Sequence, residues 1–309
     1  MINRIKRIIN RPERLIIGIQ LRLAHITGNQ KMLIKALYRL MIGKNLNLST
    51  PQTFTEKIQW LKLNDHNPLY HKMVDKYEVK KYVADIIGEE YIIPTIGVWD
   101  NFEDINFEEL PNQFVIKSTN GGGGSGVIIC HDKNTLNMIS TKEKLEDSLK
   151  IDIYSIMGEW VYKDIPPRIL VEQYMENAGK PLIDYKFFCF NGDPKFFFIA
   201  ADRFNDNNEA PIFDFYDMNC DLLPFNNVGY RSSGVKHVKI ERFEEMISIA
   251  KRLSQNIPFL RVDLYLINGK VYSGETTFYH DSGFYAFEPA SYDYSLGKML
   301  DISAVKKTI

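Results

Sequence analysis

The segment "VIKSTNGGGGSGVIIC", residues 115–130, places four consecutive glycines between two short apolar runs. The runs at 113–118 and 126–130 have the composition of β-strands, and Lys117 lies near the end of the first. Glycine lets a ligand approach the backbone closely, and consecutive exposed N–H groups suit an anion, above all phosphate. No lysine follows the glycines, as a P-loop requires, and no helix opens there, as a dinucleotide fingerprint requires. We therefore predict a hairpin flap whose N–H groups, between residues 121 and 126, face an anionic ligand, rather than a merely mobile surface hairpin.

The composition is that of a folded globular protein. The chain has 309 residues, of which 45% are hydrophobic and 25% charged, and its net charge is −1. Three scattered cysteines, Cys130, Cys189 and Cys220, give neither a disulfide framework nor metal-ligand spacing, which favours a reducing cytoplasm. No uncharged apolar run reaches the roughly 18 residues of a membrane-spanning helix, and the N-terminus does not have the pattern of a signal peptide.

Charge is unevenly distributed along the chain. Residues 1–45 contain ten Lys or Arg and a single acid, a net charge of +9, and the rest of the chain carries −10. Apolar residues at helical spacing predict two or three amphipathic helices within 2–43. Two interpretations stay open: a surface that docks on anionic lipid or an acidic glycan, or a helical cap packed on the body with its basic face solvated.

Helices and hairpins alternate in the remainder of the chain. The predicted helices are 49–63, where Thr53 and Glu56 have the spacing of a capping box, and 75–87, 133–150 and 243–257. Pro94 and Gly97 are expected to break the chain, and 168–175 is expected to be a strand. Two hairpins are predicted at 184–200 and 259–278, each around an Asn-Gly turn. The absence of a βαβ run favours an α+β fold.

Two carboxylates are predicted to meet on the second hairpin. "RVD", residues 261–263, is expected to end one strand, and "GETT", residues 274–277, lies on the other. Asp263 and Glu275 would then share one face of the sheet. Carboxylate oxygens together with nucleotide phosphates are what Mg²⁺ prefers. A carboxylate pair alone is more often a solvated edge, so the prediction depends on the flap and its lysine.

The ordered set of segments resembles the ATP-grasp superfamily, and more specifically the TupA-like ATP-grasp family of bacterial surface-polysaccharide clusters. The similar segments are "TFTEKIQWLKL" (53–63), "DKYEVKKYV" (75–83), the glycine segment, "DYKFFCFNGDPKFF" (184–197) and "RVDLYLINGKVYSGETTFYHDSGF" (261–284). The resemblance covers roughly residues 50–300. It implies two α+β subdomains that clamp ATP, behind a helical N-terminal extension.

The resemblance also implies a division of the chain. Residues 1–50 would form the basic helical extension, and 51–112 an N-terminal, substrate-side subdomain. Residues 113–175 would form the small lid subdomain with the flap, and 176–309 the C-terminal subdomain with the metal site.

The same resemblance implies a set of ATP-binding residues. Lys76 and Lys117 would neutralise the ATP phosphates. Glu172 would lie near the adenine amino group, with the backbone of Gln173 to Met175 along the base, and Asp184 would contact the ribose. The flap over the phosphates would include Gly122, Gly123, Gly124, Ser125 and Gly126.

Further residues are expected at the reacting groups. By resemblance, Arg261 would stabilise the acyl-phosphate step, Lys186 would contact phosphate or substrate, and Asp263 and Glu275 would bind Mg²⁺. Many relatives have asparagine where this chain has Thr277, whose hydroxyl is a weaker metal ligand, which puts a second metal position in question.

Three other side chains have two interpretations each. His280 is either a base for an incoming amine or a structural histidine. Arg203 and Arg231 either bind the acceptor carboxylate through a bidentate fork or form surface ion pairs.

These features predict an ATP- and Mg²⁺-dependent carboxylate–amine ligase in the cytoplasm or at the inner face of the membrane. The resemblance implies a uronic-acid carboxylate and an amino acid or other small amine as substrates. A glycosyltransferase that uses a nucleotide sugar is the alternative, although the chain has no compact D-x-D motif. A non-catalytic scaffold is a third hypothesis, against which Lys117, Arg261, Asp263 and Glu275 argue. No nucleic-acid-binding module is identified.

Overall fold

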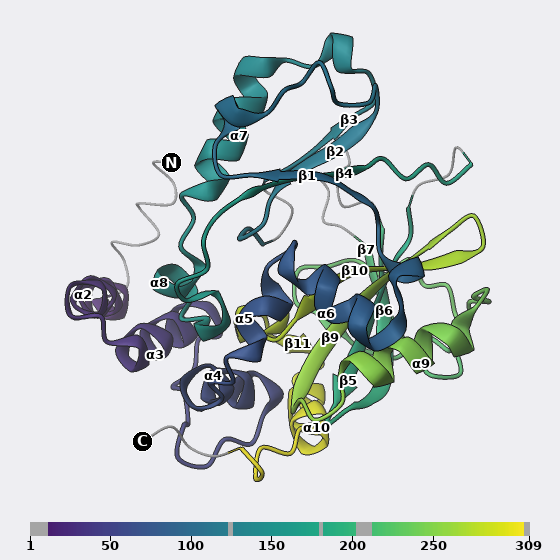
Figure 1. Ribbon diagram of the computed structural model, residues 1–309. Helices are drawn as coiled ribbons and strands as arrows, with labels where there is room; N and C mark the ends of the chain where they lie inside the picture. Colours follow the sequence, from purple (N-terminus) through teal and green to yellow (C-terminus); the bar gives the residue numbers. More distant parts are fainter. Residues whose placement is uncertain (1–11, 123–125, 179–181, 202–211, 306–309) are drawn as a thin grey trace.

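Two antiparallel sheets organise the molecule, and each has a core of its own (Figure 1). The structure is a computed structural model that describes residues 12–122, 126–178, 182–201 and 212–305. The strand order is β1-β4-β2-β3 in the four-stranded sheet and β10-β9-β5-β6-β7 in the five-stranded sheet. Helices pack against both sheets, so the predicted α+β class is confirmed.

The five-stranded sheet consists of two hairpins and an edge strand. Its strands are β5 (Asp184–Phe190), β6 (Asp193–Ala201), β7 (Ile212–Asp217), β9 (Phe259–Ile267) and β10 (Lys270–Thr277). The β5–β6 turn is Asn191-Gly192 and the β9–β10 turn is Asn268-Gly269, and all four residues have positive φ. Such turns match the right-handed twist of the flanking strands. Both predicted hairpins are therefore confirmed.

Helices cover both faces of the five-stranded sheet. They are α4 (Phe54–Asn64), α5 (Leu69–Val74), α6 (Glu78–Ile87), α9 (Phe243–Leu253) and α10 (Ser291–Met299). Phe54 of α4 packs edge-on against Phe259, with ring centroids 4.9 Å apart, on one face. Phe243 of α9 packs against Phe187 and Phe197 on the other. The predicted capping box of Thr53 and Glu56 starts α4, as expected.

The four-stranded sheet lies apart from the first, at the top of Figure 1. Its strands are β1 (Thr95–Trp99), β2 (Phe114–Ser118), β3 (Val127–Cys130) and β4 (Ile169–Gln173), and α7 (Met138–Leu149) packs on it. Leu145 of α7 and Phe114 of β2 belong to its separate core. Because β1 pairs with β4, the predicted boundary after residue 112 lies within this sheet.

The N-terminal helices form a hairpin at one side of the molecule (Figure 1). They are α2 (Pro12–Thr27) and α3 (Gln30–Met41), and α3 also contacts the short α8 (Ile153–Met157). A small ladder of β8 (Asn226–Asn227) and β11 (Phe287–Glu288) completes the regular structure. No helix in the described part of the chain is long and apolar enough to cross a membrane. The three cysteines are free and buried.

Candidate functional site

A β-bulge at Gly274 brings Glu275 to the same sheet face as Asp263. Ser273 pairs with Leu264, but Glu275 pairs with Asp263, so Gly274 is the extra residue. In a regular ladder Glu275 would stand opposite Val262 and point to the other face. A Cβ at position 274 would lie 2.7 Å from the Tyr265 ring, which explains the glycine. "RVD" lies in the middle of β9 rather than at its end, because the strand continues to Ile267.

This register gathers five of the predicted residues. Lys186, Asp263 and Glu275 form one row across β5, β9 and β10. Arg261 and Thr277 pair directly in a second row, two residues along β9 and β10. Side chains alternate along strands with a period of two, so both rows lie on one face. The sheet therefore combines two cations, two carboxylates and a hydroxyl on a single surface.

The Asp263 carboxylate is fully engaged by cations. Its two oxygens accept from Arg261 Nε and Nη2 at 2.7 and 2.8 Å, and Lys186 Nζ also pairs with it. Lys186 in turn pairs with Asp184 Oδ2 at 2.5 Å. Asp184, which was predicted to contact the ribose, is therefore engaged in an ion pair here. Burial by itself would raise the pKa of Asp263, but Arg261 and Lys186 outweigh it and lower the pKa to about 2.

Glu275 is in the opposite situation. Its side chain is half-buried, and none of the described residues hydrogen-bonds to or ion-pairs with its carboxylate. The hydroxyl of Thr277, two residues on, is buried and has no partner within the described residues. Free carboxylate and hydroxyl oxygens on one face are hard ligands that fit Mg²⁺. The described residues contain no preformed cluster of three His, Cys, Asp or Glu side chains.

Lys76 connects the two sheets. It lies between α5 and α6, and its ammonium donates to the carbonyl of Gly121 at the start of the glycine loop. Burial lowers the pKa of Lys76, and the charges of Glu275, Lys117 and Glu172 act on it as well. Glu275 belongs to the five-stranded sheet, whereas Lys117 and Glu172 belong to the other. The polar residues of both sheets therefore face a common region.

Glu172 is held between two lysines. Lys117 on β2 pairs with its Oε2 at 2.5 Å, and Lys80 on α6 pairs with its Oε1 at 2.6 Å. Burial by itself would raise the pKa of Glu172, but the two ammonium groups hold it below its ordinary value. Sequence analysis did not identify Lys80, although it follows Lys76 by only four residues and lies in α6. Gln173 ends β4, and its N–H donates to the carbonyl of Pro94 at 3.0 Å; Met175 follows two residues later, half-buried.

A pair of serine side chains lies next to the two ends of the glycine loop, Gly121 and Gly126. Ser118 and Ser148 hydroxyls are 2.5 Å apart. A Cβ at Gly126 would lie 2.2 Å from Ser148 Oγ, and one at Gly121 would lie 2.7 Å from Ser118 Oγ. Close approach to this pair therefore requires glycine at both ends of the loop. A Cβ at Gly122 would meet nothing closer than 3.6 Å. The predicted β2–β3 hairpin is confirmed, and Gly123, Gly124 and Ser125 lie outside the described residues.

His280 supports Arg261. Arg261 Nη1 lies 3.1 Å from His280 Nδ1, and His280 Nε2 lies 3.3 Å from Asn227 Oδ1. Arginine can only donate, so Nδ1 accepts and Nε2 carries the proton. Burial lowers the pKa of His280 to about 4. The lone pair of His280 Nδ1 thus accepts the hydrogen bond from Arg261. This favours a role for His280 in positioning Arg261 over a role as a base.

The pH dependence of stability should reveal the buried neutral His280. The unfolded chain binds this proton with a pKa of 6.5 and the folded chain with a pKa of about 4. Acid therefore favours unfolding, and stability from this group is complete above pH 6.5 and lost progressively down to pH 4. Between pH 7.5 and 5 we expect the wild type to lose about 2 kcal/mol more than His280→Gln in urea unfolding. The exposed His237→Gln variant is the control, and equal losses in all three proteins would contradict the prediction.

The two predicted substrate arginines are not tested by the structure. Arg203 lies outside the described residues. Arg231 is exposed, and its carbonyl accepts from the N–H of Phe213 at the start of β7. A substrate role for either residue stays a prediction.

A buried network that links Lys62 to Glu159 through Ser282 was not predicted. Lys62 of α4 donates from Nζ to the carbonyls of Met157 and Ser282, at 3.0 and 2.7 Å. Glu159 accepts from the Ser282 hydroxyl. Burial lowers the pKa of Lys62 to about 7 and raises that of Glu159. Asp281 and Ser282 both have positive φ, so this network fixes the turn that follows His280.

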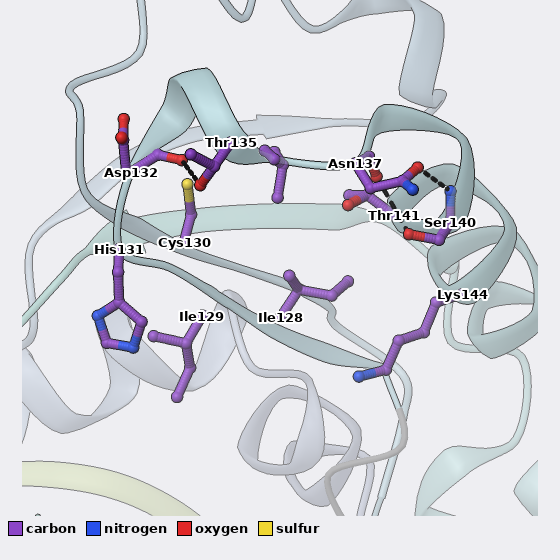
Figure 2. A pocket seen from close by; sticks show the side chains of 11 residues that line it. Ile128, Ile129, Cys130, His131, Asp132, Thr135, Asn137, Ser140, Thr141 and Lys144 are labelled. Carbon is purple, nitrogen blue, oxygen red and sulfur yellow. Dashed lines mark hydrogen bonds between the residues drawn. The ribbon is translucent and has the colours of Figure 1, made fainter.

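A well-formed pocket in the described part of the chain lies elsewhere. Figure 2 shows it between β3 and the start of α7, with a volume of about 450 Å³, lined by Ile128, Cys130, Asn137 and Thr141 among others. None of the predicted site residues lines it. Its Lys144 is occupied, because the ammonium donates to the carbonyl of Val127 at 2.8 Å. The charged face of the five-stranded sheet is therefore the better candidate for chemistry.

The site thus combines an antiparallel sheet that bears carboxylates and an arginine with lysines and the glycine hairpin of a second sheet. The family model described as TupA-like ATP-grasp matches residues 56–301, and the chain belongs to this family. The comparison with curated proteins finds no match.

Solved structures include distant relatives. D-alanine–D-alanine ligase from Bacillus anthracis, complexed with ATP, is 16% identical over 67% of this chain and 53% of that one, with a TM-score of 0.38. The Helicobacter pylori enzyme is 18% identical over 78% and 61% of the two chains, with a TM-score of 0.36. The matched part of this chain thus spans less than two thirds of either ligase, and the assignment rests on the family match.

Proposed function

We propose that the protein is an ATP- and Mg²⁺-dependent ligase that joins a carboxylate to an amine. The observation that carries the proposal is the face on which Arg261, Lys186 and Asp263 are locked together beside a free Glu275. The family of the chain supports it. ATP-grasp relatives named as ligases, such as those above, are consistent with this reaction class.

The proposed reaction has two balanced steps. A substrate carboxylate oxygen attacks the γ-phosphorus of ATP and ADP leaves, giving an acyl phosphate. The amine nitrogen then attacks the acyl carbon, phosphate leaves and takes up the proton that the amine loses, and an amide remains. Both steps develop negative charge on phosphoryl or carbonyl oxygens, so they need fixed cations rather than a protein nucleophile.

The side chains of this chain supply those cations. Lys76, which donates to the Gly121 carbonyl, and Lys117, which pairs with Glu172, would bind phosphate from the side of the four-stranded sheet. Arg261 is held rigidly by Asp263 and His280, which leaves its orientation independent of the substrate. Glu275 and Thr277 would hold Mg²⁺, which would neutralise phosphate charge when bound. The glycine loop would exclude water from the acyl phosphate.

The substrate class follows from the family resemblance. TupA-like proteins are associated with acidic surface polysaccharides, so a uronic-acid carboxylate and an amino acid or small amine are proposed. The four cations Lys76, Lys117, Lys186 and Arg261 suit the anionic carboxylate and phosphates together.

ADP release tests the proposal. Purified protein with ATP and Mg²⁺ is supplied with UDP-uronic acids and a pool of amino acids, each alone and both together. We expect ADP only when both partners are present, and subdivision of the active pool would identify the amine. Consumption of a nucleotide sugar without ATP binding would overturn the proposal in favour of a glycosyltransferase.

A further inference from the structure

Helix α2 is apolar on two opposite sides. Ile17 and Ala24 are buried on the side that packs against the protein. Five large apolar side chains are exposed by 46 to 72%: Leu15, Ile16, Ile19, Leu23 and Ile26. At about 100° per residue their positions fall within an arc of roughly 100°. A surface helix normally presents polar residues on its outer side, so this apolar face is unpartnered within the described residues.

The same helical hairpin is strongly basic, with Glu13 in the first turn of α2 as its single acid. Residues 15–45 contain no Asp or Glu, and their charged residues are Arg22, Lys31, Lys35, Arg39 and Lys44. Lys31, Lys35 and Arg39 follow one another at intervals of four and are all exposed. This spacing puts them in one stripe along α3. An apolar face and a basic stripe thus occupy neighbouring helices.

We propose that this hairpin docks on an anionic lipid bilayer. The five apolar side chains would enter the boundary between headgroups and acyl chains, and the basic residues would meet anionic headgroups. A hydrated acidic glycan could neutralise the basic stripe but would not bury the apolar face. A second copy of the chain could bury that face but would bring two basic stripes together, with Glu13 as the single acid of each hairpin.

The position of the hairpin suits such docking. In Figure 1, α2 lies at the edge of the molecule and α3 stands between it and the rest. The proposal does not depend on the ligase activity, because it rests on the surface of a different part of the chain.

Vesicle sedimentation tests the proposal with the full chain. The vesicles contain phosphatidylcholine alone, or phosphatidylcholine and phosphatidylglycerol at about three to one. We expect binding to the anionic vesicles that weakens at least tenfold in 0.5 M salt or without phosphatidylglycerol. The double variant Ile19→Glu with Leu23→Glu should weaken binding at least tenfold, and so should Lys31→Gln with Lys35→Gln and Arg39→Gln.

Ile139→Glu is the matched control, because Ile139 is 74% exposed on α7, far from the hairpin in sequence. It should bind like the wild type, and thermal unfolding checks that every variant is folded. Absence of binding to anionic vesicles, or equal binding by the α2 variant, would overturn the proposal. Self-association in analytical ultracentrifugation that is lost in the α2 variant, without vesicle binding, would assign the face to a second copy instead.

Discussion

Replacing Asp263 with asparagine is expected to lower the free energy of unfolding by about 3 kcal/mol or more. Asp263 is 1% exposed, and its carboxylate neutralises Arg261 and Lys186, which are 9% and 4% exposed. Asparagine keeps the shape but removes the charge, so Lys186 would keep the carboxylate of Asp184 while Arg261 would lose the carboxylate with which it pairs. Removing one partner of a buried ion pair typically costs about 3–5 kcal/mol. Urea unfolding at pH 7 measures the loss.

Two further variants show whether charge is the cause. Asp100→Asn changes an exposed aspartate and should alter stability by less than about 0.5 kcal/mol. Combining Asp263→Asn with Lys186→Met removes one of the two cations that pair with Asp263, so the double variant should lose less stability than the sum of the single variants. If the losses in free energy of unfolding of the two single variants were strictly additive, or if Asp263→Asn were as stable as the wild type, the ion pairs would not contribute the stability predicted here.

Local signals in the sequence were sufficient where the structure is determined locally. The capping box at Thr53 and Glu56 is a contact within one turn, and the Asn-Gly turns at 191 and 268 need only their own backbone conformation. Helix starts were less certain. The helix predicted from 75 begins at Glu78, because the Asp75 side chain accepts from the N–H groups of Tyr77 and Glu78 and leaves Lys76 outside the helix.

Strand β1 shows how tertiary structure overrides local signals. Pro94 and Gly97 were expected to break the chain, yet Thr95–Trp99 pairs with β4. Gly97 lies at a register shift, and a Cβ there would overlap the Trp99 ring at 2.2 Å. The glycine therefore shapes the strand instead of ending it. This role of Gly97 can be recognised only from the pairing of β1 with β4.

The sequence predicted which residues form the site, but not which of them form ion pairs with one another. The sequence analysis predicted that Asp263 and Glu275 share one face of neighbouring strands, and the structure shows that they do so only because of the Gly274 bulge, which was not predicted. The sequence did not indicate that Asp263 is occupied by Arg261 and Lys186 whereas Glu275 is free. The Lys62–Glu159 network and the Lys80–Glu172 pair were missed because residues far apart in sequence leave no local pattern.

Because Asp263 is paired with cations whereas Glu275, among the described residues, is not, substitution of Glu275 is expected to affect activity rather than stability. Glu275→Gln is expected to lower ADP formation by about a thousandfold while changing stability by less than about 1 kcal/mol. Stability should hold because the side chain is half-buried and unpaired within the described residues. Activity should fall because an uncharged amide binds Mg²⁺ weakly and no longer balances Lys76.

The measurements are initial rates of ADP release against Mg²⁺ concentration, together with urea unfolding of the same preparations. Glu108→Gln, an exposed glutamate near the four-stranded sheet, is the matched control and should retain full activity. Glu275→Asp keeps the charge and should recover part of the rate at high Mg²⁺, which a purely structural role would not produce. Full activity of Glu275→Gln would remove this carboxylate from the proposed metal site. Because Asp263 is held by two cations, the site would then have no free carboxylate among the described residues of its two rows.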